Sequence, residues 1–264
     1  MGELQQVGIV TKYELLKHLR RKRLYAVLLI AAVVGFLQPI VPIAFNIAFP
    51  EKVNEWASSF FNFANLLIVI AGAFFAGDAI SSEFEHRTGY IIFPNPVKRT
   101  SLVFGKFIAA CISVLLTISL YYAIGVGAVF SIYNMVPLET ATSFAYAVLY
   151  ILCVLGLTFL FSSFLKGSMG ATLLSFFLLF LIMPIFSSVI TLTGTEPWFI
   201  PTYAAGMTTQ VLNPQEDRVI SIPGNPVKIY MFYPKFPISL IVLVVYFAVA
   251  FILSLILVDR KDMT

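Results

Sequence analysis

Charged residues are scarce in this sequence, and cysteine and histidine are almost absent. Only 11% of the 264 residues are Asp, Glu, Lys or Arg and 59% are hydrophobic, whereas soluble domains have roughly 25% charged and 45–50% apolar residues. A soluble core of this chain length could not bury so much apolar surface. The composition therefore excludes a soluble enzyme or binding domain and predicts a single transmembrane domain over residues 1–264.

The groups that usually perform chemistry are also missing. The two cysteines, Cys111 and Cys153, lie inside apolar runs, and neither histidine is grouped with other metal ligands at a suitable spacing. No phosphate-binding loop is present, because Gly105-Lys106 is followed by Phe107 and no glycine lies five residues before Gly105. We therefore predict no catalytic residue, no cofactor site and no metal site in this chain.

Long runs without charge make up most of the chain instead. Because a helix needs about 20 mostly apolar residues to cross a bilayer, we predict an all-α integral membrane protein with six transmembrane helices. The predicted spans are Leu24–Phe49, Phe60–Ile80, Phe107–Tyr133, Ala141–Leu165, Gly170–Thr193 and Pro237–Val258. Pro39 and Pro42 should kink the first span, and Pro184 the fifth, because proline removes a backbone donor and crowds the preceding turn.

Lysine and arginine lie mainly on one side of these spans. If both termini and the second and fourth connections share a side, that side holds 13 of the 17 basic residues. The positive-inside rule then predicts a multi-pass protein of the cell (plasma) membrane with both termini in the cytoplasm. Because the bases lie beside hydrophobic runs, we expect contact with the lipid bilayer and none with nucleic acid.

The polar segment 1–23 ahead of the first span has apolar residues at helical spacing, at Ile9, Tyr13, Leu16 and Leu19. This pattern predicts an amphipathic helix in the cytoplasmic interface. A solvated basic tail that only fixes topology is the alternative. The candidate residues of the interfacial helix are Tyr13, Leu16, Lys17, Arg20 and Arg21.

Two connections are too long to be plain turns. The external connection, 194–236, has six prolines and two β-prone runs, Val219–Ile222 and Val227–Phe232, which indicate a hairpin-like excursion. Within it, Thr202–Leu212 can form a short helix at the outer surface. The other long connection, 81–106, is cytoplasmic by the topology above.

The cytoplasmic connection 81–106 has the pattern of a stiff surface element. Glu83–Phe93 can form a short amphipathic helix with acids in its first turn, where they suit the positive end of the helix dipole. Pro94 and Pro96 then stop it, because the residue before a proline is disfavoured in helical geometry. Such a coupling helix between two spans can transmit a push from a soluble partner. A merely solvated charged loop is the alternative.

This connection resembles that of the membrane (permease) subunits of type-2 ATP-binding cassette (ABC) transporters. The family pattern is Ile-Ser-x-Glu-x-Glu-x-Gly-Thr, an apolar run, Pro-Val-x-Arg, and Gly-Lys at the start of the third span. The matching residues here are Ile80, Ser81, Glu83, Glu85, Thr88, Pro96, Val97, Arg99, Gly105 and Lys106. The sequence departs at Arg87, where Gly is usual, and at Gly89, where an apolar residue is more common.

The resemblance implies a permease subunit of an ATP-driven ABC transporter and favours export. Because the spans hold almost no charge, a lipid, a drug-like molecule or a hydrophobic peptide is a more natural substrate than a strongly charged one. The resemblance also implies two separately encoded ABC ATPase subunits, which would bind the ATP and Mg, and a second copy of this chain or a related permease. The residues that it implies for coupling to the ATPase subunits are Glu83, Phe84, Glu85, Arg87, Thr88, Pro96, Arg99 and Lys106. Reversing the charges at Glu83 and Glu85 should uncouple transport without preventing membrane insertion.

Other functions stay open at this point. The spans hold no ionisable residue near their centres, and Asp78, near the cytoplasmic end of the second, suits an interfacial or cap-like role better than an ion site. Energy is therefore expected to arrive from outside the spans. An energy-independent channel or scaffold would equally lack catalytic residues. An intramembrane enzyme needs polar residues clustered at one depth, which scattered residues such as Asn62, Asn65 and Ser113 do not clearly provide.

Overall fold

The structure is a computed structural model that describes residues 2–20, 22–85, 98–221 and 228–260. Within these residues it is mostly helical, and six helical segments are long and apolar enough to cross a membrane. The predicted fold class, an all-α integral membrane protein with six spans, is therefore confirmed.

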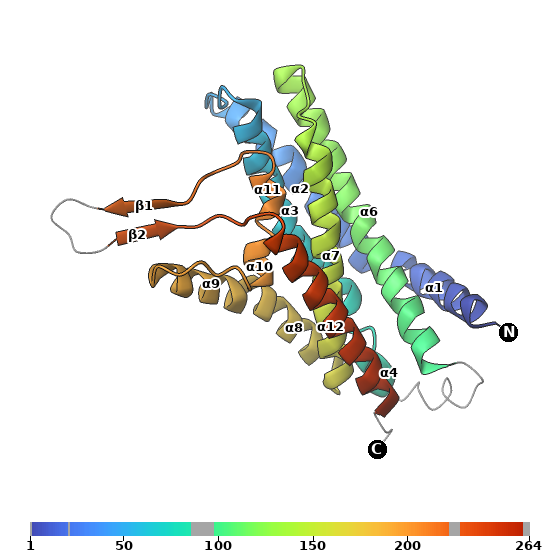
Figure 1. The fold of residues 1–264 in the computed structure, drawn as a ribbon. Coiled ribbons are helices and arrows are strands. Elements are labelled where there is room, and N and C mark those ends of the chain that lie inside the picture. The colour runs from blue at the N-terminus through green and yellow to red at the C-terminus, as the bar shows by residue number, and fades with distance from the viewer. Residues whose placement is uncertain (1, 21, 86–97, 222–227, 261–264) are drawn as a thin grey trace.

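Long helices that lie side by side form the body of the molecule (Figure 1). The spanning elements are α2 Lys22–Ala44, α3 Val53–Ala76, α6 Arg99–Tyr133, α7 Glu139–Phe164, α8 Ser168–Phe177, η1 Leu178–Ile182, α9 Met183–Leu192 and α12 Ile238–Arg260. The fifth span consists of α8, η1 and α9 in sequence. The first span ends at Ala44 rather than at the predicted Phe49, and the third begins at Arg99 rather than at Phe107.

The centre of the bundle is formed by α3, α6 and α7, which contain most of the fully buried side chains. Aromatic rings join α3 to α6, since Phe60 stacks on Tyr121 with ring centroids 4.9 Å apart, and Phe61 stacks on Tyr122 at 4.4 Å. Gly125 of α6 faces the same rings, and a Cβ atom there would lie 2.5 Å from the Phe60 ring. The missing side chain therefore lets the two helices approach closely, as small residues do between membrane helices.

The fifth span is broken near its middle. Residues Leu178–Ile182 form a π-helical turn, and α9 follows at once with Pro184 in its first turn. Because Pro184 has no N–H to donate and its ring crowds the preceding turn, a regular α-helix cannot continue unchanged. In Figure 1, α9 turns away from the axis of α8, which confirms the predicted kink. The helix α2 continues through Pro39 and Pro42, and the kink expected there stays a prediction.

The connection after α9 begins with two short helices, α10 Pro201–Ala204 and α11 Met207–Gln210. They pack against α3, α7 and α12. The predicted helix over Thr202–Leu212 is therefore present in two pieces, and its expected place at the outer surface of the membrane stays a prediction. Within the protein, Ala204 and Thr208 are fully buried. Hydrogen bonds described below account for this burial.

A hairpin follows, formed by β1 Arg218–Ser221 and β2 Lys228–Met231. The two strands pair antiparallel, with Val219 opposite Tyr230. This pairing confirms the predicted hairpin-like excursion within the connection 194–236. Residues 222–227, between the two strands, lie outside the described residues.

The N-terminal helix α1, Glu3–Arg20, lies crosswise to α6 near one end of the bundle (Figure 1). That end also holds α4, Ser81–Glu85, the start of α6 and the end of α12, and we call it the basic end. Thr11 donates a hydrogen bond from Oγ1 to the carbonyl oxygen of Gly105 at 3.2 Å. A Cβ atom on Gly105 would lie 2.6 Å from Val10, so glycine permits this close contact. The N-terminal segment is thus a packed helix rather than a free tail.

The polar side of α1 faces the bundle. His18 is buried, with Nδ1 2.8 Å from Ser113 Oγ of α6 and its ring centroid 5.2 Å from that of Phe75. On the other side of α1, Ile9 and Tyr13 are exposed. This orientation suits a helix whose apolar residues contact the interfacial region of a membrane.

Candidate functional site

The short helix α4 is held by three spanning helices. From α7, Ser162 accepts hydrogen bonds at Oγ from the backbone N–H groups of Ile80 and Ser81, at 3.0 and 3.1 Å. The other two attachments come from Lys106 of α6 and from the start of α8. The sequence predicts that the connection starting at α4 couples to a partner. Hydrogen bonds to the spanning helices therefore hold the beginning of this connection in place.

Lys106 of α6 lies at the centre of a buried group of charges. Its Nζ is 2.5 Å from Glu83 Oε1 in α4, 3.2 Å from Glu14 Oε1 in α1 and 2.7 Å from the carbonyl oxygen of Ala79. Since a lysine ammonium has three N–H donors, these three acceptors satisfy it. The Lys106 cluster, which we define as Lys106, Glu83 and Glu14, therefore joins α1, α4 and α6.

The Lys106 cluster is shielded from solvent, since the Lys106 side chain is only 3% exposed. Burial by itself raises the pKa of Glu14, but the neighbouring charges of Lys106 and Lys17 outweigh it, so the pKa of Glu14 lies below its usual value. Glu14 therefore stays ionised at neutral pH and contributes its full charge to the cluster.

Glu85 connects α4 to the beginning of the fifth span. Its Oε2 accepts a hydrogen bond from the backbone N–H of Ser168 at 2.7 Å and another from the Ser168 hydroxyl. Ser168 is the first residue of α8, so the carboxylate satisfies a terminal N–H donor and lies at the positive end of the helix dipole. A displacement of α4 would therefore act directly on α8.

Two arginines link further helices at the basic end. Arg23, at the start of α2, forms an ion pair with Asp78 through Nη1 and Oδ2, 2.8 Å apart. Arg99, at the start of α6, donates to the carbonyl oxygens of Val258 and Asp259 in the last turn of α12, both at 3.1 Å. A cation is favourable there because carbonyl groups at a helix C-terminus lack partners within the helix.

The structure gives the predicted coupling residues different surroundings. Glu83 and Lys106 are buried partners of each other, Phe84 is half-buried against the core, Glu85 contacts α8, and Arg99 contacts α12. The other three predicted residues, together with most of the predicted coupling helix, lie outside the described residues; they are Arg87, Thr88 and Pro96. Contact of these residues with an ATPase subunit stays a prediction.

The predicted residues of the interfacial helix also have different surroundings. Lys17 forms an ion pair with Glu14 at 3.0 Å and so extends the Lys106 cluster. Tyr13, Leu16 and Arg20 are exposed on α1. Arg21 lies outside the described residues.

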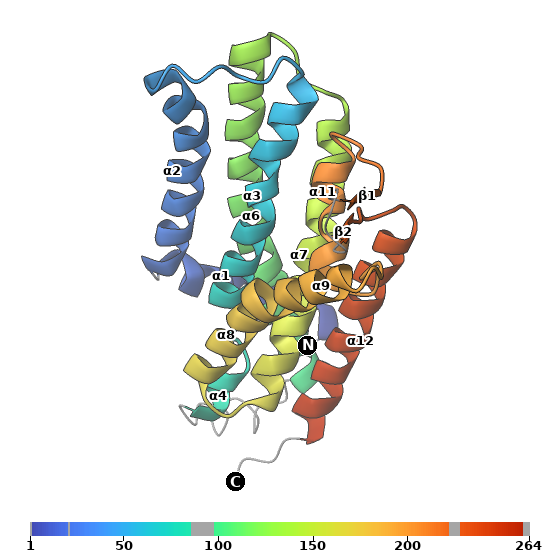
Figure 2. The same ribbon diagram turned by 90° about the vertical axis from the view of Figure 1, so that its left-hand side faces the viewer.

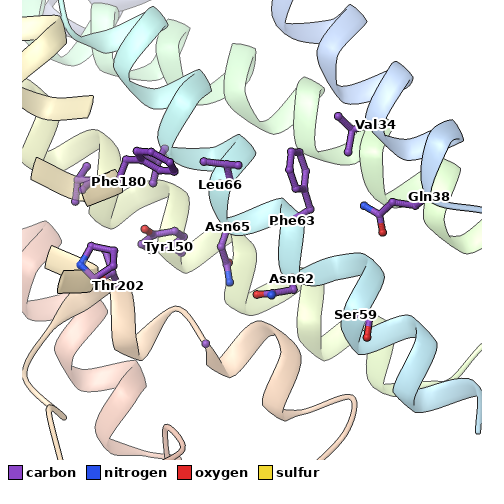
Figure 3. Close-up of a pocket in the computed structure, with 14 residues that line it drawn as sticks. Val34, Gln38, Ser59, Asn62, Phe63, Asn65, Leu66, Tyr150, Phe180 and Thr202 are labelled. Carbon is purple, nitrogen blue, oxygen red and sulfur yellow. The ribbon is translucent and has the colours of Figure 1, made fainter. Parts of the chain in front are cut away.

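A cavity of about 740 Å³ lies between α2, α3, α7 and the broken part of the fifth span (Figure 3). Its lining residues are Val34, Gln38, Ser59, Asn62, Phe63, Asn65, Leu66, Val69, Tyr150, Leu179, Phe180, Pro184, Thr202 and Gly206. None of these is charged. Across the described part of the chain, no group of three or more His, Cys, Asp or Glu side chains could hold a metal ion.

Two amides that line the cavity are fixed by neighbouring groups. Gln38 of α2 donates from Nε2 to the Tyr121 hydroxyl at 2.7 Å, and this hydroxyl donates to the carbonyl oxygen of Phe60 at 2.7 Å. Asn65 of α3 donates from Nδ2 to Thr208 Oγ1 of α11 at 3.0 Å. The side chains of both amides are therefore oriented before any ligand enters.

Further hydrogen bonds from α6 and α7 hold α11 inside the bundle. The carbonyl oxygen of Thr208 accepts a hydrogen bond from Ser143 Oγ of α7 at 2.6 Å, and Ser143 Oγ is 2.9 Å from the Tyr122 hydroxyl of α6. Polar groups are costly inside a membrane unless they are paired. These bonds explain how polar groups of α11 can be buried among the spanning helices.

Two other polar groups of the cavity are available to a ligand. Asn62 is exposed, and it has no hydrogen-bond partner within the described ranges. Thr202 Oγ1 is buried, and it too has no partner among the residues that the structure describes. A cavity with free amide and hydroxyl groups on otherwise apolar walls suits an uncharged ligand that can form a few hydrogen bonds.

The sequence alone did not reveal this cavity. Asn62 and Asn65 were visible only as scattered polar residues within the second span. One signal was present, because Ser59, Asn62 and Leu66 recur at three- and four-residue spacing and therefore share one face of α3. Figure 3 shows Ser59, Asn62 and Asn65 on successive turns of that helix. Thr202 lines the cavity only because α10 and α11 fold back against the spanning helices. No local sequence pattern predicts that arrangement.

Comparison with known families agrees with this arrangement. The model of the family described as ABC-2 family transporter protein matches residues 9–263, nearly the whole chain. No curated protein matches the chain. The family match confirms the resemblance that the connection 81–106 suggested. The chain therefore belongs to the ABC-2 transporter family, as a multi-pass membrane permease subunit of an ABC transporter.

Proposed function

We propose that this chain is a membrane-spanning subunit of an ATP-driven exporter and that the basic end of the chain lies in the cytoplasm. Permease subunits of this family associate with ABC ATPase subunits and with a membrane. In this proposal two separate ATPase subunits bind ATP and Mg and dock at α4 and the connection that follows it. Both termini are then cytoplasmic and the chain lies in the plasma membrane.

The observation that supports this function most directly is the continuous path from α4 to the cavity. Glu85 of α4 holds the first residue of α8 through the backbone N–H of Ser168. The same span continues through η1 into α9, and Leu179, Phe180 and Pro184 of these segments line the cavity. A push on α4 would therefore reach the cavity wall along one helix.

The break in that helix is suited to such a movement. The π-helical turn Leu178–Ile182 lies between the end that contacts α4 and the part that lines the cavity. Single π turns often occur at functional sites because they interrupt the regular ladder of hydrogen bonds. In our proposal, displacement of α8 changes the angle at η1 and so widens or closes the cavity.

A second copy of the chain would complete the transport path. In Figure 2, α2, α3 and α9 lie on the same face of the molecule. On that face α9 has no buried residue within its bounds, and α2 buries only Leu24, Val27, Ala31 and Gly35. Two such faces placed opposite each other would enclose the two cavities between them. A related permease with a similar face would serve equally well.

The lining of the cavity favours an uncharged amphipathic cargo. Its apolar walls suit a lipid, a drug-like molecule or a hydrophobic peptide, and Asn62 and Thr202 supply hydrogen-bonding groups. A strongly charged cargo would have to lose its hydration without gaining an opposite charge. We therefore place anions and multivalent cations outside the expected cargo range.

Cysteine cross-linking during co-purification tests this proposal. The chain would be expressed with an ABC ATPase subunit from the same organism and purified in a mild detergent, with a single cysteine introduced at Lys98 or at Leu138. Lys98 is exposed at the basic end, and Leu138 is 86% exposed in the connection between α6 and α7 at the other end. We expect the ATPase subunit to co-purify and to cross-link to Lys98→Cys alone.

Two other results would each contradict one part of the proposal, either the orientation of the chain or its ATPase partner. Cross-linking at Leu138→Cys in place of Lys98→Cys would show that the opposite end faces the ATPase subunits. Failure of any nucleotide-binding subunit to co-purify would favour an energy-independent channel or a scaffold.

A further inference from the structure

A second cavity lies on the outer side of the seam between α1 and α6. It is a groove of about 540 Å³, and its walls are almost wholly apolar. Seven of its lining residues are Leu4, Val7, Gly8, Leu15, Leu16 and Leu19 of α1 and Ile108 of α6. Thr11 and Lys12 complete the lining. Since the residues of α1 recur at three- and four-residue spacing, they form one face of that helix.

Lys12 gives this apolar groove a positive charge. It lies near the middle of the groove-lining face of α1, its side chain is exposed, and within the described residues it has no carboxylate partner. The two acids of α1 are engaged elsewhere, because Glu3 pairs with Lys98 and Glu14 pairs with Lys17 and Lys106. The charge of Lys12 is therefore not compensated by its own helix.

The groove also lies where a lipid would reach it. α1 crosses α6 near the basic end of the bundle (Figure 1), and exposed apolar side chains such as Leu4 and Leu19 border the groove. A cation over an apolar surface at the boundary of a bilayer matches a phospholipid, whose phosphate and acyl chain make these two kinds of contact together.

We propose that the groove between α1 and α6 binds one anionic phospholipid of the cytoplasmic leaflet, with its acyl chain along the leucines and its phosphate at Lys12. The leaflet assignment depends on the proposed orientation of the chain, whereas the binding itself does not. The far side of α1 contributes Glu14 to the Lys106 cluster. The bound lipid would thus hold α1 from outside while the cluster holds it from within.

Native mass spectrometry of the full-length chain tests the binding. The protein would be released from nanodiscs of palmitoyl-oleoyl phosphatidylcholine that contain increasing amounts of palmitoyl-oleoyl phosphatidylglycerol, and the lipids retained by each chain would be counted. We expect one phosphatidylglycerol per chain to be retained in preference to phosphatidylcholine. Because a basic residue near the membrane surface adds about 1 kcal/mol of attraction, Lys12→Gln should weaken that preference about fivefold.

Two further variants separate a built site from general electrostatic attraction. Gly8→Leu keeps every charge but fills the groove, and it should fold because a Cβ at Gly8 meets nothing within 4 Å. It should therefore remove the retained lipid. Lys166→Gln makes the same change of charge as Lys12→Gln at an exposed site outside the groove, in the connection between α7 and α8. It should leave retention unchanged.

The contrary outcomes are distinct. Equal losses in Lys12→Gln and Lys166→Gln, with no loss in Gly8→Leu, would show diffuse attraction to the membrane and overturn the site. If no lipid is retained and Gly8→Leu instead prevents an ATPase subunit from co-purifying, the groove is a protein contact and the proposal is wrong. Neither outcome depends on the cross-linking result at Lys98, so the site and the proposed function can fail separately.

Discussion

The basic end and the cavity use polar residues in opposite ways. At the basic end, charges are paired with one another, as in the Lys106 cluster, and they fasten α1, α4 and α6 together. In the cavity no lining residue is charged, and Asn62 has no partner within the described residues. Strong charge pairs thus lie at the basic end, where an ATPase subunit would push. Weak, reversible hydrogen-bonding groups lie in the cavity, where a cargo would pass.

The largest effect should come from removing the charge of Lys106. Lys106→Met leaves the carboxylates of Glu83 and Glu14 buried without their common partner, and breaking such a buried arrangement typically costs about 3–5 kcal/mol. Thermal unfolding in detergent should show a clear loss of stability. Lys98→Met is the matched control, because its ion pair with Glu3 is mostly exposed and should be worth about 1 kcal/mol or less. Equal melting temperatures for the two variants would show that burial does not strengthen the cluster.

A smaller loss should follow when α11 is released from α3. Asn65→Leu removes the hydrogen bond to Thr208 and leaves a buried hydroxyl with fewer partners, at a cost of about 1–3 kcal/mol. Hydrogen exchange over 201–212 should become faster. Asn62→Leu, three residues away on the same helix, removes an amide without a partner among the described residues and should change the exchange little. Equal exchange in the two variants would mean that the contact with Asn65 does not hold α11 in place.

The contrast between these two asparagines shows where inference from sequence reaches its limit. Long charge-free runs determine the six spans, and the loss of the N–H at Pro184 determines where the fifth span breaks. Both features depend on local chemistry. The different roles of Asn62 and Asn65 depend instead on α11, which is distant in sequence.

The coupling element shows the same limit. The motif around Glu83 and Glu85 identified the family from the sequence, because its residue types and spacing are local. The sequence pattern does not distinguish the two acids and predicts both as partner contacts. In the structure Glu83 is bonded inside the protein and Glu85 holds α8. That difference follows from the positions of Lys106 and Ser168 in other spans, which the local pattern does not contain.

Glu85 connects the basic end to the span that lines the cavity, so its substitution tests whether this contact links the two regions. Glu85→Ala should cost about 1 kcal/mol, because it removes the side-chain acceptor at the start of α8. It should reduce transport more than stability, since α4 would no longer hold the span that lines the cavity. Transport and melting temperature would be measured on the same purified complex. Glu51→Ala, an exposed acid near the start of α3 at the other end, is the control. Unchanged transport in Glu85→Ala would exclude this contact as the coupling path.

The smallest effect on stability should come from Asn62→Asp, which places one charge in the cavity. Because Asn62 is exposed and has no partner within the described residues, the substitution breaks no contact, and only the reduced hydration of the new carboxylate should lower the melting temperature slightly. It should nevertheless change which molecules stimulate ATP hydrolysis by the complex. A neutral amphiphile should stimulate less than in the unmodified protein, and the lipophilic cation tetraphenylphosphonium should stimulate more, because a carboxylate attracts a cation strongly in an apolar cavity. Glu51→Gln, a change of charge outside the cavity, should leave both responses as they were. If Asn62→Asp and Glu51→Gln behave alike, the uncharged lining does not select the cargo, and the contrast between the two regions describes only the stability of the fold.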